Sequence, residues 1–270
     1  MLRIPVAWNI RCSDMDLSRY SRLTRMVVRS LALLSSRPGA VATNSRKAVE
    51  VHQGLGYADR DYEIIPGGFD TGRYRPDPEA RAAVRAELGA ADDDVLVGWI
   101  GRDDPMKDLP CLAAAFNRAA ASNPRLRLVL AGSGLGPDDP AINLFQDNAS
   151  RCSFLGPRRD VERILAGLDA FALSSRSEGL PNVVGEAMAA ELPCAVTDAG
   201  DTARLVGDTG RVAPVGDAEA LGDALASLAA LPADERAALG RAARQRIIDR
   251  YSIQAMVDAY AALYRRLAGR

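Results

Sequence analysis

Apolar residues form two different patterns along the chain. From residue 94 onward, short continuous apolar runs are separated by longer segments in which apolar residues recur every three to four positions. The runs predict buried strands, and the longer segments predict amphipathic helices. The predicted strands span residues 95–101, 126–132, 152–155, 169–175, 194–197 and 211–213.

The segments between these strands predict the helices that cover a sheet. We expect helices over residues 108–121, 138–148, 161–168, 181–192, 232–251 and 252–269. Pro181 suits the first turn of its helix because a missing N–H is harmless there, and Ser252 suits an N-cap. Strands that alternate with helices predict a parallel sheet covered on both faces. The fold class is therefore α/β, with a doubly wound, Rossmann-like domain over about residues 80–250.

The first 75 residues carry a shorter version of this pattern. RIPVAWNI, AVATNS and YEIIP predict three short strands, separated by helices expected at 14–36 and 45–54. Three parallel strands leave an open edge where further strands would pair, and such an edge is a liability. The chain therefore resembles one whole domain joined to the tail of a second. Two prolines in RYRPDPEA (73–80) predict the linker.

Composition excludes several classes of protein. With 48% hydrophobic and 26% charged residues, the 270-residue chain is typical of globular proteins. The net charge of −1 provides no basic field, so we expect no nucleic-acid partner. No apolar run reaches the length of about 18 residues that a membrane span requires, and the N-terminus does not resemble a signal peptide. We expect a cytoplasmic protein.

The cysteines predict neither a metal site nor a redox motif. Cys12, Cys111, Cys152 and Cys194 lie far apart and form no CxxC pair. Reduced thiols are expected in the cytoplasm. We therefore expect no metal and no cofactor.

Two glutamates flank a helix N-terminus in the segment SEGLPNVVGE (177–186). Ligands of open α/β sheets bind at the carboxyl ends of strands, and the predicted strand 169–175 ends just before this segment. The helix dipole attracts an anion, and Glu178 and Glu186 could accept hydrogen bonds from sugar or ribose hydroxyls. A capped surface helix with a solvated glutamate is an equally good interpretation of the local pattern.

The backbone of the same segment suits a phosphate. Gly179 permits close approach of a ligand to the main chain. The amides around Leu180, Asn182 and Val183 belong to the first turn of the predicted helix, where they have no partner within the helix. Together with the two glutamates, they suggest a ligand that carries both phosphate and hydroxyl groups.

A second cluster follows the predicted strand 95–101. GRDDPMKDLP places Arg102 and Lys107 around a turn at the start of the next helix. Two cations at the carboxyl end of a strand would neutralise a diphosphate leaving group. Taken alone, a solvated basic pair beside three aspartates is the better interpretation.

Two further loops strengthen the prediction. AGSGLGPDD (131–139) and LGPRRDV (155–161) follow the next two predicted strands. Because the strands are parallel, all four loops should line one rim of the sheet. The glycines of the first loop follow a GxGxG spacing and precede Pro137, which does not match a dinucleotide fingerprint and argues against NAD.

In order along the chain, these motifs resemble the retaining family 4 glycosyltransferases of the GT-B fold. The resemblance rests on VATNS, GY, EIIPGGFDTGRYRPD, GRDDPMKD, LAGSG, FLGPRRDV and SSRSEGLPNVVGEAMAAELP, and it covers nearly the whole chain. Its most specific part is the pair Glu178 and Glu186. It implies two facing doubly wound domains, the C-terminal one binding a nucleotide sugar. WNIRCSDMD and EAMAAELP most resemble bacterial transferases of surface polysaccharide or glycolipid assembly.

The resemblance also implies roles for particular residues. Arg102 and Lys107 would hold the diphosphate, Glu178 the donor sugar and Glu186 the ribose, while the loop 155–158 would meet the base. The implied catalytic residues are Arg102, Lys107 and Glu178, and the implied donor-binding residues are Gly101, Gly132, Gly134, Leu155, Gly156, Arg158, Gly179, Leu180, Pro181, Asn182, Val183 and Glu186. The donor would be a UDP or GDP sugar and the acceptor a saccharide or a lipid-linked saccharide.

The chain departs from the family pattern at its N-terminal end. Gly67 and Gly68 stand where the family has Asn-Gly, which changes a turn. The Gly-rich acceptor-side loop and the donor-contacting histidine of the family are absent. The only histidine, His52, lies in a predicted helix and is expected to be structural. The expected domains are 1–77, the end of the acceptor-side domain with the linker; 78–250, the donor-binding domain; and 251–270, a helix that packs back on the N-terminal part.

Two alternatives to a complete glycosyltransferase stay open. The chain could be a truncated, non-catalytic fragment that binds nucleotide sugar. It could also be a nucleotide-sugar epimerase, since those enzymes share the GT-B architecture, although the order of motifs argues against this.

The predicted helix 14–36 adds a question about membranes. Arg19, Arg22, Arg25 and Arg29 share one of its faces. Such a face could rest on anionic lipid at the inner side of the membrane, where a lipid-linked acceptor would lie. A solvated face is the favoured interpretation, because basic helix faces are common.

Overall fold

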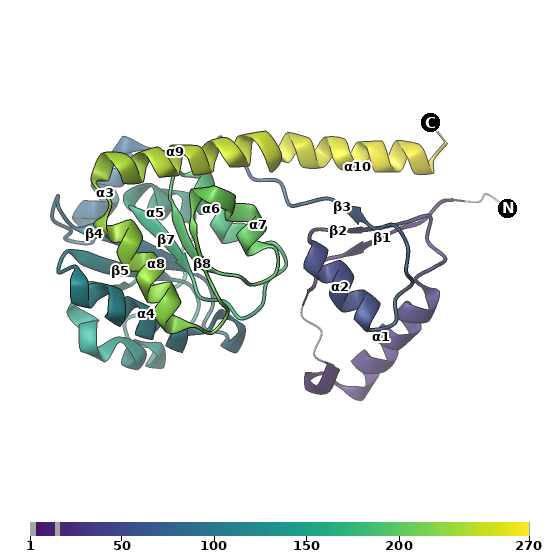
Figure 1. Cartoon of the computed structure of the whole chain (residues 1–270), viewed down its shortest axis with the longest axis horizontal. Coiled ribbons are helices and arrows are strands. Elements are labelled where there is room, and N and C mark those ends of the chain that lie inside the picture. Colours follow the sequence, from purple (N-terminus) through teal and green to yellow (C-terminus); the bar gives the residue numbers. More distant parts are fainter. Residues whose placement is uncertain (1–3, 14–16, 270) are drawn as a thin grey trace.

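The computed structural model describes residues 4–13 and 17–269 and has two lobes, each built on a parallel sheet (Figure 1). The N-terminal lobe contains β1 to β3 with α1 and α2. The C-terminal lobe contains β4 to β9 with α3 to α9. Among the described residues, no helix is both long and apolar enough to cross a membrane.

The N-terminal lobe is a small sheet in the order β1-β2-β3. Its strands are β1 (Ala7–Ile10), β2 (Ala40–Thr43) and β3 (Glu63–Ile64), and α2 (Arg46–Gly54) connects the last two. The expectation of one helix over 14–36 was wrong. Residues 14–16 lie outside the described part, Leu17–Arg19 form a 3₁₀ turn, and α1 spans Arg22–Leu34. The helix begins there because the Ser21 side chain accepts a hydrogen bond from the amide of Thr24 at 3.2 Å.

The C-terminal lobe contains six parallel strands, in the order β6-β5-β4-β7-β8-β9. All six were predicted from their apolar runs: β4 (Val95–Ile100), β5 (Leu126–Ala131), β6 (Cys152–Phe154), β7 (Ala170–Leu173), β8 (Cys194–Thr197) and β9 (Arg211–Ala213). The strand order reverses between β4 and β7. Their carboxyl ends therefore mark the crevice where open α/β sheets bind ligands.

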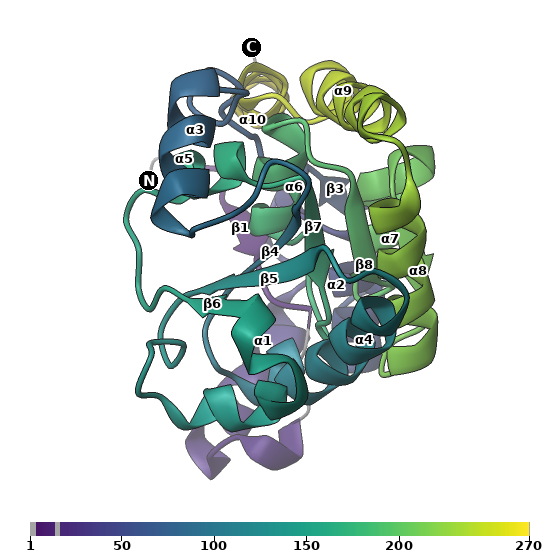
Figure 2. The same ribbon diagram turned by 90° about the vertical axis from the view of Figure 1, so that its left-hand side faces the viewer.

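Helices cover both faces of this sheet (Figure 2). One face packs on α4 (Leu109–Ser122) and α8 (Ala218–Ala230), and the other packs on α5 (Val161–Gly167), α6 (Asn182–Ala189) and α9 (Ala233–Arg250). The sequence analysis did not anticipate α8, nor α3 (Pro78–Glu87) and α7 (Thr202–Val206).

The helix expected over 138–148 is a 3₁₀ stretch over Pro140–Arg151 instead. Phe145 and Asn148 have non-helical backbone angles inside it, which break a regular α-helix. The buried ring of Phe145 packs edge-on against Phe154 of β6, and this contact holds the stretch on the sheet.

The last helix of the chain lies on the first lobe. α10 (Ile253–Leu267) runs on from α9 and passes along the N-terminal sheet (Figure 1). Leu263 is buried there against Ala40, Ala42 and Ile65. The chain thus passes between the lobes twice, once through residues 65–77 and once at the α9–α10 junction.

The two crossing segments contact each other. The Phe69 amide donates to the Tyr251 carbonyl at 2.8 Å, and Phe69 forms an isolated parallel β-bridge with Ser252. The buried Phe69 ring lies against Gly185 of α6, so close that a Cβ on that glycine would stand 2.1 Å from the ring. A side chain at residue 185 would therefore push the crossing segment away.

Candidate functional site

Three strand-end loops of the C-terminal lobe are joined into one rim. The Gly132 amide donates to the Gly156 carbonyl at 2.8 Å, and the Gly156 amide donates to Leu135 at 2.8 Å. Gly132 has a φ of +142°, and a Cβ there would stand 1.7 Å from the Gly101 carbonyl oxygen. Only glycine permits this approach, so the structure brings Gly101, Gly132 and Gly156 together.

Gly134 and Leu155 complete this part of the rim. Gly134 has a φ of +82° and faces Asp103, whose amide donates to the Ser133 carbonyl at 2.8 Å. The Leu155 amide continues the β5–β6 ladder by donating to Leu130 at 2.9 Å. The loops after β4, β5 and β6 are therefore fixed to one another through their backbones.

Lys107 and Glu178 meet across the reversal point of the strand order. The Lys107 Nζ lies 2.5 Å from the Glu178 Oε1, and the Ser175 hydroxyl donates to the same oxygen at 2.7 Å. The Lys107 carbonyl in turn accepts from the Ser174 hydroxyl at 2.7 Å. The two side chains are 23% and 13% exposed, so this charge pair is partly shielded from water but open on one side.

Backbone geometry places Lys107 at this point. It ends a short 3₁₀ turn, and Asp108 after it adopts a left-handed conformation with a φ of +50°. The Asp108 carboxylate caps α4 through the Cys111 amide and lies 2.8 Å from the Arg176 Nε. These contacts hold the turn that carries Lys107.

Arg102 lies on the same rim but is loosely held. Its side chain is 76% exposed, and its nearest carboxylate, that of Asp104, is 3.8 Å away. A surface ion pair of this kind contributes little to stability. The guanidinium is therefore able to turn toward an anion at the rim.

The N-terminus of α6 points its amides at the same rim. α4 and α8 have aspartate side-chain caps, whereas α6 starts after Pro181 without one. Within the described part of the chain, the amides of Gly179, Leu180, Asn182 and Val183 donate to no acceptor. Unpaired amides and the helix dipole make this end attractive to an anion.

Glu186 lies one turn into α6 and is half-buried. Burial raises the pKa of its carboxyl group, and the neighbouring Tyr74 hydroxyl partly offsets this rise. Burial and the charge of Glu186 raise the pKa of Tyr74 to about 12. Arg73 lies over the Tyr74 ring and pairs with Glu162 at 3.0 Å. The sequence analysis treated this segment only as a linker and missed Tyr74.

Arg158 is engaged with carboxylates. Its guanidinium donates to both oxygens of Asp160, at 2.8 and 2.7 Å, and to Glu87 at 2.8 Å. These contacts raise the pKa of Arg158 and lower that of Asp160. The arrangement fixes the loop after β6, whose Gly156 backbone is bonded to the loop after β5.

Residues of the N-terminal lobe contact the rim directly. The Ser13 hydroxyl donates to the Glu178 carbonyl at 2.5 Å. The Asp201 carboxylate accepts from the Arg46 amide at 3.0 Å and from the Lys47 amide at 3.1 Å, both in the first turn of α2. The Asp201 amide donates to the Gly179 carbonyl at 2.9 Å. The sequence analysis missed Ser13 and Asp201, because 165 and 154–155 positions separate the partners.

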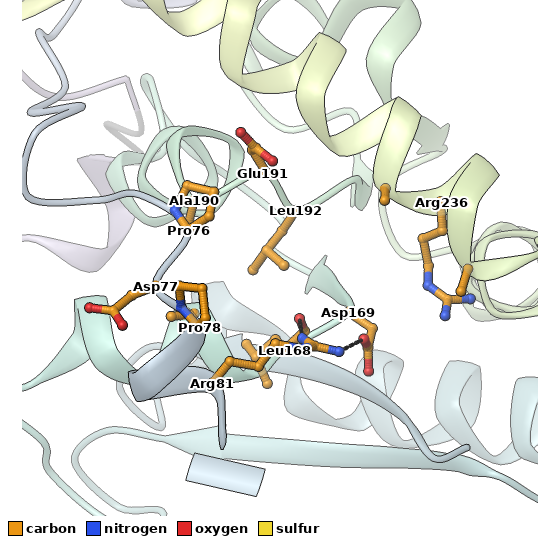
Figure 3. Close-up of a pocket in the computed structure, with 13 residues that line it drawn as sticks. Pro76, Asp77, Pro78, Arg81, Leu168, Asp169, Ala190, Glu191, Leu192 and Arg236 are labelled. Carbon is orange, nitrogen blue, oxygen red and sulfur yellow. Dashed lines mark hydrogen bonds and ion pairs between the residues drawn. The ribbon is translucent and has the colours of Figure 1, made fainter. Parts of the chain in front are cut away.

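A separate pocket lies near the opposite, amino-terminal edge of the sheet (Figure 3). Pro76, Pro78, Leu168 and Leu192 provide apolar walls, and an Arg81–Asp169 ion pair of 2.6 Å lies on its floor. None of the expected site residues lines this pocket. The rim and this pocket are therefore different places on the lobe.

Comparison with known proteins gives consistent results. Residues 94–230 match the family model described as glycosyl transferases group 1. The D-inositol 3-phosphate glycosyltransferase of Saccharomonospora viridis is 34% identical over 217 residues, which are 74% of this chain and 49% of that protein. The Nocardia farcinica protein of the same name is 33% identical over 178 residues, covering 62% and 38% of the two chains. The chain spans about half the length of the curated relatives it matches.

Solved structures show a similar fold. Anabaena HepE in complex with UDP-glucose superposes with a TM-score of 0.80 at 21% identity, over 96% of this chain and 72% of that one. The sucrose-phosphate synthase of Thermosynechococcus elongatus gives a TM-score of 0.80 at 22% identity, over 97% and 68% of the chains. These similarities identify the fold as GT-B.

Proposed function

Because the chain belongs to the glycosyl transferases group 1 family, we propose that it binds a nucleoside-diphosphate sugar at the rim and moves the sugar to an acceptor. The observation that carries the proposal is the Lys107–Glu178 pair beside the open N-terminus of α6. It offers a cation and backbone amides for phosphates, and a carboxylate for sugar hydroxyls. HepE was solved with UDP-glucose, which favours a UDP sugar, and a GDP sugar is the alternative.

The diphosphate leaving group is the centre of the proposed mechanism. Negative charge grows on the phosphate as the bond to the anomeric carbon breaks. Lys107, Arg102 and the amides of α6 meet that charge in a preorganised site, and losing one such donor typically costs about 3–4 kcal/mol in the transition state. The phosphate competes with Glu178 for Lys107, which leaves the carboxylate available to the donor sugar. Transfer proceeds with retention of the anomeric configuration.

Other residues orient the rest of the donor. The Glu186 carboxylate, with Tyr74 beside it, accepts hydrogen bonds from the ribose hydroxyls. The backbone at Leu155 and Gly156 faces the base, while Arg158 holds that loop through Asp160 and Glu87. The glycines of the rim let the diphosphate lie against the main chain.

The acceptor belongs on the side of the N-terminal lobe. A saccharide or lipid-linked saccharide of bacterial surface polysaccharide or glycolipid synthesis suits a cytoplasmic enzyme at the inner face of the membrane. α1 supports peripheral contact, since Arg22 and Arg29 are exposed beside the exposed side chains of Met26 and Leu33.

Binding and transfer are separate parts of the proposal. Calorimetric titration with UDP and with UDP-glucose tests the rim, and release of UDP from UDP-glucose tests catalysis. Lys107→Ala and Glu186→Ala should each abolish most transfer, and Lys47→Ala is the matched control, because Lys47 forms an exposed pair with Glu50 at 2.9 Å.

The outcomes distinguish the two candidate functions. Near-normal transfer in the Lys107 or Glu186 variant would contradict the assigned roles. UDP binding without transfer by the wild-type chain would favour a donor-binding module without catalysis. This alternative is specific to the present chain, because it spans about half the length of its relatives.

A further inference from the structure

A cysteine and a histidine meet just beyond the carboxyl end of β1, outside the donor rim. The Cys12 thiol is exposed, and its Sγ lies 3.9 Å from the Nε2 of His52. The imidazole is only 3% exposed. The pair therefore joins an exposed cysteine to a buried ring.

The surroundings of His52 fix its tautomer. Nδ1 lies 2.8 Å from the Ala48 carbonyl oxygen, and a carbonyl can only accept, so Nδ1 carries the proton. Nε2 then directs its lone pair at the thiol. Burial also lowers the pKa of His52, and the Tyr57 ring packs edge-on against it at 4.9 Å, so the imidazole is held neutral and in place.

A pocket opens at this pair. Cys12 and His52 line it together with Trp8, Leu31 and the cationic Arg11. A nucleophile beside a base that a third group orients is the usual arrangement of an activated thiol. A nearby cation and partial exposure are further features of reactive cysteines.

We propose that Cys12 is a reactive thiol that a small disulfide modifies covalently. His52 Nε2 accepts the proton of the Sγ, and the thiolate attacks one sulfur of the disulfide. A new bond forms between Cys12 and that sulfur as the original sulfur–sulfur bond breaks. The other half leaves as a thiolate and takes the proton from His52, so the small disulfide is the oxidant and no further reagent is needed.

The other three cysteines provide internal controls. Burial raises the pKa of Cys111 to about 11 and that of Cys152 to about 12. Cys194 is 1% exposed, and burial raises its pKa as well. Thiols of this kind are inert, because the thiolate is the nucleophile.

Modification of Cys12 would reach the donor rim. The next residue, Ser13, donates to the Glu178 carbonyl in the loop proposed to bind the donor sugar. An adduct on Cys12 would displace this contact and weaken nucleotide binding. This consequence rests on the proposed function, whereas the reactivity of the thiol does not.

The reactivity is tested on the whole reduced chain. It is incubated with oxidised glutathione, or with iodoacetamide for rates, and each cysteine is followed by peptide mass spectrometry. We expect Cys12 to react at least about tenfold faster than Cys152, because burial raises the pKa of the Cys152 thiol to about 12 and so keeps it protonated. Cys12→Ser should remove the adduct, and His52→Gln should slow the reaction several-fold.

A second comparison needs no variant. Cys12 of the folded chain should react faster than the same thiol in the chain unfolded in guanidinium at the same pH. Equal rates in these two states, or an unchanged rate in folded His52→Gln protein, would overturn the proposal. If His52→Gln does not fold, the comparison of folded and unfolded wild type decides by itself.

The effect on the rim is measured with UDP. The glutathione adduct should bind UDP several-fold more weakly than the reduced chain, while Cys12→Ser should bind it normally. Equal UDP affinity with and without the adduct would refute the link to the rim. Absence of UDP binding by the reduced chain would refute the proposed function and leave the thiol result standing.

Discussion

Asp201 offers a sharp test of how the two lobes are held together. Its carboxylate is 8% exposed and accepts the first two amides of α2, while Ser45 caps the third through the Ala48 amide at 3.1 Å. These amides have no partner within the helix. One residue of the C-terminal lobe thus completes a helix of the N-terminal lobe.

The structure sets the size of the effect. Losing a helix cap costs about 1 kcal/mol, and a partly buried negative charge at a helix N-terminus contributes up to about 2 kcal/mol. Asp201→Asn keeps the shape and one acceptor but removes the charge, so we expect a loss of about 1–2 kcal/mol. For a chain of 270 residues, that lowers the melting temperature by roughly 2–4 °C.

The assay is thermal unfolding of Asp201→Asn against a matched variant, Asp198→Asn. Asp198 is exposed and lies three residues earlier in the same loop, and its carboxylate forms no hydrogen bond or ion pair with the described residues. Hydrogen exchange at the amides of Arg46 and Lys47 should rise in the Asp201 variant alone. Equal melting temperatures for the two variants would refute the capping argument.

Three further predictions concern α6. Burial raises the pKa of Glu186, so the folded chain keeps the proton on this carboxyl group to a higher pH than the unfolded chain does. The folded state therefore loses stability as the pH rises from the ordinary glutamate pKa to the raised pKa. Urea unfolding at pH 4 and pH 7 should show Glu186→Gln gaining on wild type at the higher pH, and parallel profiles would contradict this. Phe69→Ala should cost about 3–4 kcal/mol in urea unfolding, because the ring is 5% exposed. Gly185→Ala should cost about 1–3 kcal/mol of unfolding free energy, because the new methyl group crowds the Phe69 ring. The double variant Gly185→Ala/Phe69→Ala should lose less stability than the sum of the two single losses, and strict additivity would rule out the contact.

Local patterns predicted the strands of the C-terminal lobe because they are short and mostly apolar runs between helices. The same patterns missed α3, since Pro76 and Pro78 suggested only a linker. Pro78 in fact stands in the first turn of that helix behind its Asp77 cap. The helix expected over 138–148 failed because its apolar spacing does not exclude a 3₁₀ stretch.

The contacts of the candidate site were likewise predicted only in part. Lys107 and Glu178 are 71 positions apart, yet their convergence follows from the rule that parallel strands end at one edge. No such rule relates Ser13 to Glu178 or Asp201 to α2, because these contacts depend on how two lobes dock. Tyr74 was missed because its partner Glu186 is far away in the sequence, in a helix of the C-terminal lobe.

The double passage between the lobes has a mechanical consequence. A single crossing of the chain would leave one lobe freer to rotate relative to the other. Here the segment 65–77 and the α9–α10 junction run together, joined by the Phe69 amide and the Tyr251 carbonyl at 2.8 Å. Two adjacent crossings restrict the relative rotation of the lobes more than a single crossing would. Any motion that separates the lobes must therefore break the contact of Ser13 with Glu178 and the contacts of α2 with Asp201.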